Sequence, residues 1–127
     1  MALIQTEAIT RFAPELERAL KYTGGTHSLE DLQEAAEAGE IQIWPGVESI
    51  MLTKLVDSPQ KKELVFFLAA GQMAEVERLY HVVLDWGKKQ GCERAVFVGR
   101  AGWSKSFLTR SEGWVETHRV YSKDLTT

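Results

Sequence analysis

One stretch of the sequence restricts the fold more than any other, and it runs from Leu64 to Leu125. It opens with seven consecutive apolar residues, Leu64 to Ala70, which have the length and composition of a buried strand. The segment from Met73 to Gln90 is amphipathic at helical spacing, with an apolar face formed by Val76, Leu79, Tyr80, Val83 and Gly87. A second apolar run, Ala95 to Val98, follows Gly91, a residue suited to the left-handed conformation that ends a helix. Strand, helix and strand in this order predict two parallel, neighbouring strands joined by a right-handed crossover.

The first forty residues carry helical signals. A helix is expected to begin at Ala13, whereas the pattern of residues 1–12 fits either a strand or a separate helix. Ser28 and Asp31 resemble a capping box for a further helix, and Gly39 is placed to end it.

Three short strands are expected next, joined by tight turns. Ile41 to Trp44 alternates apolar and polar residues, and the dipeptide Pro45-Gly46 favours a turn after it. Ser49 to Val56 and Lys62 to Ala70 are the second and third strands. Because the connections are short, these strands are predicted to be antiparallel neighbours.

The remaining residues are expected to add a short helix, Ser104 to Arg110, and a last strand, Val115 to Tyr121. The predicted fold class is therefore α+β, with a mixed sheet, and residues 1–127 are expected to form a single domain. The third and fourth strands should splay apart, with the long helix packed across one face. The residues expected in the core are Phe66, Leu68, Val76, Leu79, Tyr80, Val83, Val96 and Val98.

Composition narrows the function classes. The net charge is −3 and no basic block is present, which weighs against nucleic acid and anionic membranes as partners. No apolar run has membrane-spanning length, and the Met1 end does not resemble a signal peptide. The single cysteine, Cys92, has no internal disulfide partner and is expected to be a small packing residue, which fits a reducing, intracellular origin.

The order of elements resembles the GCN5-related N-acetyltransferase (GNAT) fold over nearly the whole chain. Four phrases are similar to small GNAT-like proteins of bacteriophage head and internal-virion gene clusters: residues 39–46, residues 68–71, Gly91-Cys92 and residues 99–103. This resemblance implies other phage proteins as partners. It also implies a location in the cytoplasm of the bacterial host or within the virion.

The expected cofactor loop departs from the family pattern. Acetyltransferases of this fold hold the acetyl-CoA diphosphate on a glycine-rich loop before the central helix, where backbone amides and the helix N-terminus favour anions. The corresponding residues here, which are the candidate cofactor-binding residues, are Gly71, Gln72, Met73 and Ala74. They include one glycine, and the carboxylates of Glu75 and Glu77 follow in the first turn, where they would repel a diphosphate. The main expectation is therefore that no cofactor binds.

Candidate catalytic residues are few. Tyr80 and Tyr121 are weak candidates for a general acid, and Glu40 is a weak candidate for a general base, with Glu48 and His81 as further options. No cluster of His, Cys, Asp and Glu has the spacing of a metal site.

Three residues are candidates for partner binding. Arg100 follows a predicted strand end between two glycines, and Trp103 and Trp44 lie beside turns. Two functions from different classes remain. One is a non-catalytic phage structural or assembly protein that acts by protein–protein contact. The alternative is an acyl-CoA-dependent N-acetyltransferase acting on an amine, with acetyl-CoA as its cofactor.

Overall fold

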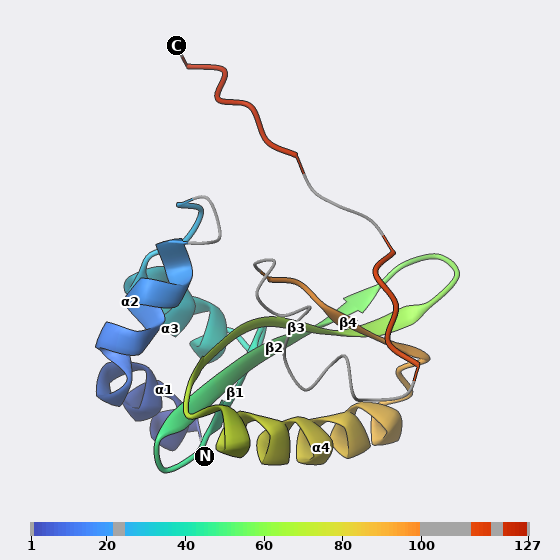
Figure 1. Cartoon of the computed structure of the whole chain (residues 1–127), viewed down its shortest axis with the longest axis horizontal. Helices are drawn as coiled ribbons and strands as arrows, with labels where there is room; N and C mark the ends of the chain where they lie inside the picture. Colours follow the sequence, from blue (N-terminus) through green and yellow to red (C-terminus); the bar gives the residue numbers. More distant parts are fainter. Residues whose placement is uncertain (1, 22–24, 100–112, 118–120, 127) are drawn as a thin grey trace.

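A computed structural model describes residues 2–21, 25–99, 113–117 and 121–126. These residues form a four-stranded sheet with helices on both faces (Figure 1). The elements are α1 (Ala2–Arg11), α2 (Ala13–Leu20), α3 (Leu29–Glu37), β1 (Gln42–Pro45), β2 (Ser49–Asp57), β3 (Lys62–Gly71), α4 (Met73–Lys89) and β4 (Arg94–Phe97). Within these ranges, no helix is long and apolar enough to cross a membrane.

The first two helices settle the question left open at the N-terminus. Residues Ala2 to Arg11 are helical, and Phe12 separates them from α2, which has Pro14 in its first turn. Proline suits that position because the first amides of a helix have no intrahelical acceptor.

The third helix begins and ends as its sequence predicts. The Asp31 amide donates to Ser28 Oγ at 3.2 Å, and the Ser28 amide donates to Asp31 Oδ2 at 2.8 Å, so the capping box is formed. Gly39, just beyond the helix, has a φ of +76°, a conformation in which glycine carries no steric cost.

The sheet has the order β1-β2-β3-β4. The first three strands are antiparallel, as expected from their short turns. The register between β2 and β3 shifts where Leu52 pairs with Leu68 and Thr53 pairs with Phe66, so Phe67 is an extra residue on β3. This β-bulge bends the strand locally.

The last two strands, β3 and β4, are parallel, and they separate at the β-bulge. Glu63 to Phe66 of β3 pair with Arg94 to Phe97 of β4, and the Val98 amide still donates to the Phe66 carbonyl at 2.9 Å. Beyond the bulge, β3 continues to Gly71 without β4 beside it. The predicted parallel pair, its splay and the helix across one face are therefore confirmed.

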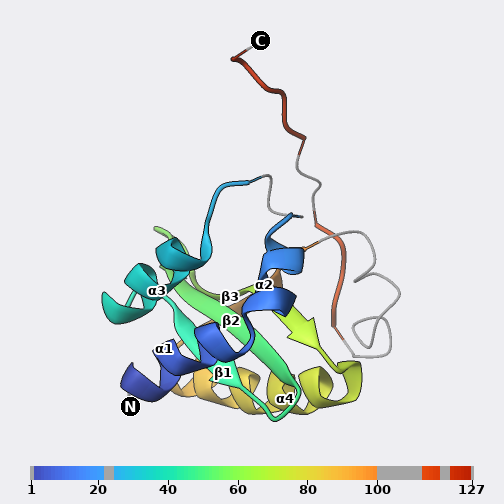
Figure 2. The ribbon, with the colours of Figure 1, turned by 90° about the vertical axis from the view of Figure 1, so that its left-hand side faces the viewer.

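Two groups of buried side chains lie on opposite faces of the sheet. Figure 2 shows α1, α2 and α3 on one side and α4 along the other. The core under the first three helices includes Ile9, Leu16, Leu32, Ile50 and Leu68. The core under α4 is formed by Met51, Leu64, Phe66, Val76, Tyr80 and Val83.

Three residues expected in the core lie at its margin. Leu79 and Val96 are only half-buried, and Val98 is 49% exposed. The helix turns Val76, Tyr80, Val83 and Gly87 toward the sheet. Because 3.6 residues make a turn, Leu79 falls at the edge of that stripe, and Val98 lies beyond the end of β4.

The end of the chain also differs from expectation. The described residues of the expected last strand, Val115 to Thr117 and Tyr121, are not in a strand. Val115 is 75% exposed and Tyr121 is 87% exposed, so neither side chain gains burial that would favour sheet pairing. The expected short helix, 104–110, lies outside the described residues.

Two leucines provide a matched test of this packing. Leu64, in β3, is 1% exposed beneath α4, and Leu79 lies at the edge of the buried face of α4. We expect Leu64→Ala to lower the free energy of unfolding by about 2–5 kcal/mol and Leu79→Ala to lower it distinctly less. Urea denaturation of both variants measures the difference. Equal losses would show that α4 is rotated from the orientation described.

Candidate functional site

The junction between β3 and α4 occupies the position of the expected cofactor loop. The strand ends at Gly71 and the helix begins at Met73, so Gln72 alone connects them. The Gln72 amide donates to the Glu48 carbonyl at 3.3 Å. Both the Glu75 and Val76 amides donate to the Gln72 carbonyl, at 3.1 and 3.0 Å. Few backbone donors of this junction therefore remain for an anionic ligand.

Gly71 is required by its neighbours in the sheet. Its φ is +109°, and a Cβ there would collide with the Glu48 carbonyl oxygen and with Ser49. The glycine therefore allows β3 to approach the start of β2. A larger residue at this position would disturb the fold itself, so substitution of Gly71 does not test cofactor binding cleanly.

Glu75, in the first turn of α4, is bound to the turn between β1 and β2. Its Oε2 accepts the Val47 amide at 2.9 Å, and its Oε1 accepts the Glu48 amide at 2.9 Å and the Ser49 hydroxyl. We call these three bonds the Glu75 clamp. The turn and the start of α4 are adjacent in Figure 1.

The clamp keeps a negative charge at the N-terminus of α4. The hydroxyl of Ser49 and the amides of Val47 and Glu48 hold the pKa of Glu75 below its ordinary value of 4.5, because each bond favours the carboxylate. The helix dipole favours the same charge. Charge repulsion at this junction was expected from the sequence, but the part that Glu75 plays in holding the turn was not.

The same turn is bound from a third element. Arg11, the last residue of α1, donates from Nη2 to the Gly46 carbonyl at 2.7 Å. The Gly46 amide donates to the Ser49 carbonyl at 2.7 Å and closes the turn. A Cβ on Gly46 would collide with the Glu75 carboxylate, so glycine is needed here for close approach.

The splay of β3 from β4 is the second feature of the site. From the Phe67 bulge to Gly71, one edge of β3 faces β2 and the other has no strand beside it among the described residues. An extended ligand that carries amide groups fits such an edge, because it can exchange backbone-type hydrogen bonds with it.

The three weak catalytic candidates are not brought together. Tyr80 lies on the buried face of α4 and is 3% exposed, and its hydroxyl accepts a bond from Trp114 Nε1 at 2.7 Å. Glu40 is exposed and follows α3, on the opposite face of the sheet. Tyr121 is 87% exposed, in a segment that extends away from the sheet in Figure 1. Their assignment to an acid and a base stays a prediction.

The other candidate bases are also dispersed. His81 is exposed, with its ring 4.9 Å from that of Tyr80. Glu48 is exposed in the turn held by Glu75. Among the described residues, no group of three or more His, Cys, Asp and Glu side chains is placed to hold a metal ion.

Cys92 is half-buried against the core under α4. Burial raises the pKa of its thiol, so little reactive thiolate forms at neutral pH. This environment fits the packing role expected from the sequence.

Of the three residues predicted to bind a partner, only Trp44 lies in the described part of the chain. Its indole Nε1 donates to Thr53 Oγ1 at 3.0 Å, and its ring meets Trp86 edge to face at 5.2 Å. The half-buried Trp44 is thus bound within the fold. Arg100 and Trp103 lie outside the described residues.

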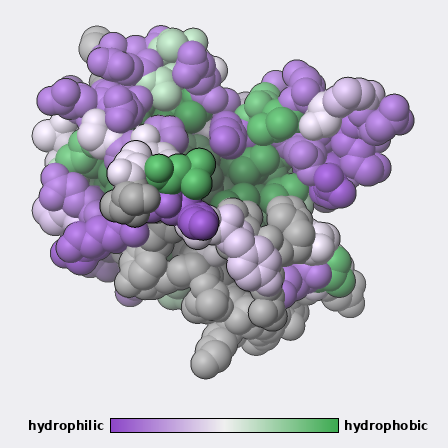
Figure 3. Space-filling view, turned by 90° about the horizontal axis from the view of Figure 1, so that it is seen from above, coloured by the Kyte–Doolittle hydropathy of each residue, from purple (hydrophilic) through white to green (hydrophobic). Residues whose placement is uncertain are grey.

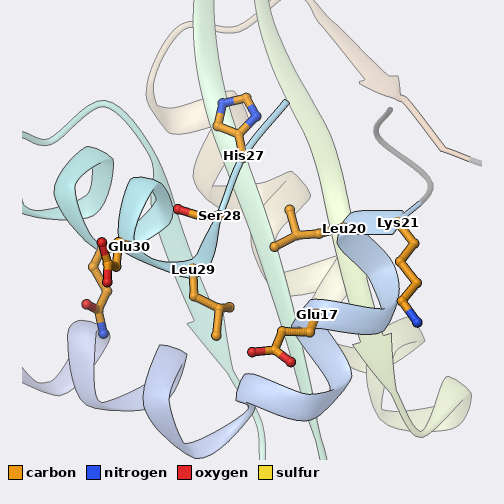
Figure 4. A pocket seen from close by; sticks show the side chains of 8 residues that line it. Glu17, Leu20, Lys21, His27, Ser28, Leu29 and Glu30 are labelled. Carbon is orange, nitrogen blue, oxygen red and sulfur yellow. The ribbon is translucent and has the colours of Figure 1, made fainter. Parts of the chain in front are cut away.

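One groove was not anticipated from the sequence. It lies between the end of α2 and the start of α3, where Leu20 and Leu29 come together with Glu17 and Glu30 (Figure 4). No local pattern signals it, because these residues are brought together only when the two helices pack on the sheet.

Comparison with known proteins supports the fold through structure alone. No family model matches the chain, and no curated protein matches its sequence. A crystal structure of a probable acetyltransferase is similar over 97% of this chain and 94% of its own, with a TM-score of 0.69 and 13% identity. Ribosomal-protein-alanine N-acetyltransferase from Brucella melitensis biovar Abortus 2308 is similar over 92% of this chain and 96% of its own, with a TM-score of 0.58 and 8% identity. BH1408 from Bacillus halodurans is similar over 79% and 76%, with a TM-score of 0.61 and 10% identity.

The architecture and these neighbours define a GNAT-like fold. The fold expected from the sequence is thereby confirmed. At these identities the likeness concerns the fold, and a relationship to phage proteins in particular stays a prediction.

The Glu75 clamp gives a test that depends on pH. A carboxylate with a lowered folded-state pKa stabilises the protein above its unfolded pKa, near 4.5, and loses that effect as the pH falls through the folded value. We expect Glu75→Gln to lower the melting temperature at pH 7, because the NH2 group of glutamine would face a donor that a carboxylate oxygen now accepts. This loss should shrink below pH 4.

The matched control is Asp85→Asn, which removes a charge from an exposed position on the same helix. It should change the melting temperature little at either pH. A loss for Glu75→Gln that is no larger than the control's, or equally large at pH 3, would contradict the clamp.

Proposed function

We propose that this chain is a non-catalytic GNAT-fold protein that acts by protein–protein contact. The observation that carries the proposal is the single-residue junction between β3 and α4, with the Glu75 carboxylate fixed beside it. The finer proposal, a structural or assembly protein of a phage particle with other phage proteins as partners, rests on the sequence resemblance alone.

The junction is a poor diphosphate site for two physical reasons. Anion sites at helix N-termini use several converging amides in a positive field. Of the four amides at the start of α4, those of Gln72 and Glu75 have acceptors within the chain, which leaves those of Met73 and Ala74 without a bond among the described residues. The ionised Glu75 reduces the positive field at the same place.

A second candidate function is favoured by different observations. Among the described residues, no strand pairs with the second edge of β3 beyond Phe67, and such an edge suits an extended ligand with amides, such as the pantetheine arm of an acyl-CoA. The neighbours named above include acetyltransferases, which supports an N-acetyltransferase acting on an amine. In that function acetyl-CoA would be the cofactor, and Tyr80, Tyr121 and Glu40 would be the residues to test first.

Isothermal titration with acetyl-CoA separates the two functions. We expect no binding heat up to millimolar cofactor, because the junction lacks the amides and the field that a diphosphate needs. Micromolar binding would contradict the non-catalytic proposal.

A matched pair of variants identifies the site if binding is seen. Ala74 is exposed in the first turn of α4, so Ala74→Glu adds a carboxylate that the helix dipole tolerates and a diphosphate does not. Ala74→Gln adds similar bulk without charge. Binding that Ala74→Glu abolishes and Ala74→Gln retains would place the cofactor at this junction and favour the acetyltransferase.

A further inference from the structure

The groove between α2 and α3 has the form of a small docking site. Its volume is about 740 Å³, and it opens to solvent between the last turn of one helix and the first turn of the other. The described residues that line it are Glu17, Leu20, Lys21, His27, Ser28, Leu29, Glu30 and Gln33. Figure 4 shows Leu20 and Leu29 on facing sides, with the Glu17 carboxylate between the two helices.

The groove combines an apolar interior with carboxylates at its rim. Leu20 is buried at 7% exposure and Leu29 is half-buried, so Leu29 supplies most of the apolar contact that the groove offers. Glu17 and Glu30 are exposed, and no ion pair involves either of them within the described part of the chain. Lys21 lines the same groove, and its charge offsets part of theirs.

The surroundings of the groove are also acidic. Residues 1–48 contain nine Asp or Glu and three Lys or Arg, a net charge of −6, whereas residues 49–127 contain nine and twelve, a net charge of +3. On α3, Asp31, Glu34 and Glu37 are exposed beyond the groove. Figure 3 shows hydrophilic side chains over these helices, with fewer hydrophobic ones among them.

We propose that this groove binds a short segment of a partner protein in which apolar side chains are flanked by lysine or arginine. The apolar side chains would displace water from Leu29 and from the small exposed part of Leu20, which supplies affinity. The flanking cations would meet Glu17 and Glu30 and the wider negative field, which supplies selectivity and speeds association. The same field disfavours an acidic segment, a nucleic acid or an anionic membrane.

This inference rests on the proposed function, because it names the surface and the partner chemistry for action by contact. Fluorescence polarisation with labelled peptides tests it on the full chain. The probe is Lys-Lys-Leu-Leu-Lys-Lys, and the reference peptides are Lys-Lys-Ser-Ser-Lys-Lys and Glu-Glu-Leu-Leu-Glu-Glu. We expect the probe to bind at least about tenfold more tightly than either reference, because only the probe satisfies both the apolar and the charged groups.

Two double variants locate the site. Glu17→Gln with Glu30→Gln should weaken probe binding by about fivefold, since exposed charge pairs each contribute modestly. Glu34→Gln with Glu37→Gln removes the same charge from α3 outside the groove and should change binding by less than about twofold. Absence of probe binding, or equal losses in both double variants, would overturn the inference.

The outcome is separable from that of the proposed function. The cofactor titration concerns the β3–α4 junction, and the peptide experiment concerns α2 and α3. If neither the peptide nor acetyl-CoA binds, the groove is not the docking site, and the protein would act by contact elsewhere on its surface. If both bind, the groove remains the proposed docking site, and the acetyltransferase replaces the non-catalytic function.

Discussion

The carboxylate of Glu75 is the interaction on which the arrangement of this protein depends most. It joins the first turn of α4 to the turn between β1 and β2, and thus connects the helix on one face of the sheet to the hairpin at its edge. Arg11 binds the same turn from the helices of the other face. A single four-residue turn, from Gly46 to Ser49, is therefore held by elements from both sides of the sheet.

This constraint also shapes the β3–α4 junction, which is where the resemblance to the family predicts a cofactor loop. Gly71 is a glycine because the start of β2 lies against it. The Gln72 amide donates to the Glu48 carbonyl, in the turn that precedes β2. Residues of the predicted cofactor loop thus make contacts that assemble the fold. Because one fold hosts many functions, a GNAT-like fold is compatible with either of the two proposed functions.

Local chemistry made most of the fold predictable from the sequence. The capping box at Ser28, the left-handed Gly39 and Gly91, and the strand–helix–strand unit depend on residues close together in the chain. The site depended on contacts between distant residues. Glu75 meets a turn 26 to 28 residues earlier, and sequence suggested only its charge. The groove between α2 and α3 likewise exists only after both helices have packed.

Amide hydrogen exchange at Val47 and Glu48 is the most direct test of the Glu75 clamp. Val47 is 83% exposed and lies in a tight turn, so its amide would exchange rapidly unless the Glu75 carboxylate accepted it. Slow exchange at both amides near neutral pH, lost in Glu75→Gln while the β2–β3 ladder stays protected, is the predicted result. Rapid exchange of both amides in the unmodified protein would show that the clamp is not formed, and the proposal that a fixed Glu75 carboxylate opposes a diphosphate at this junction would fail with it.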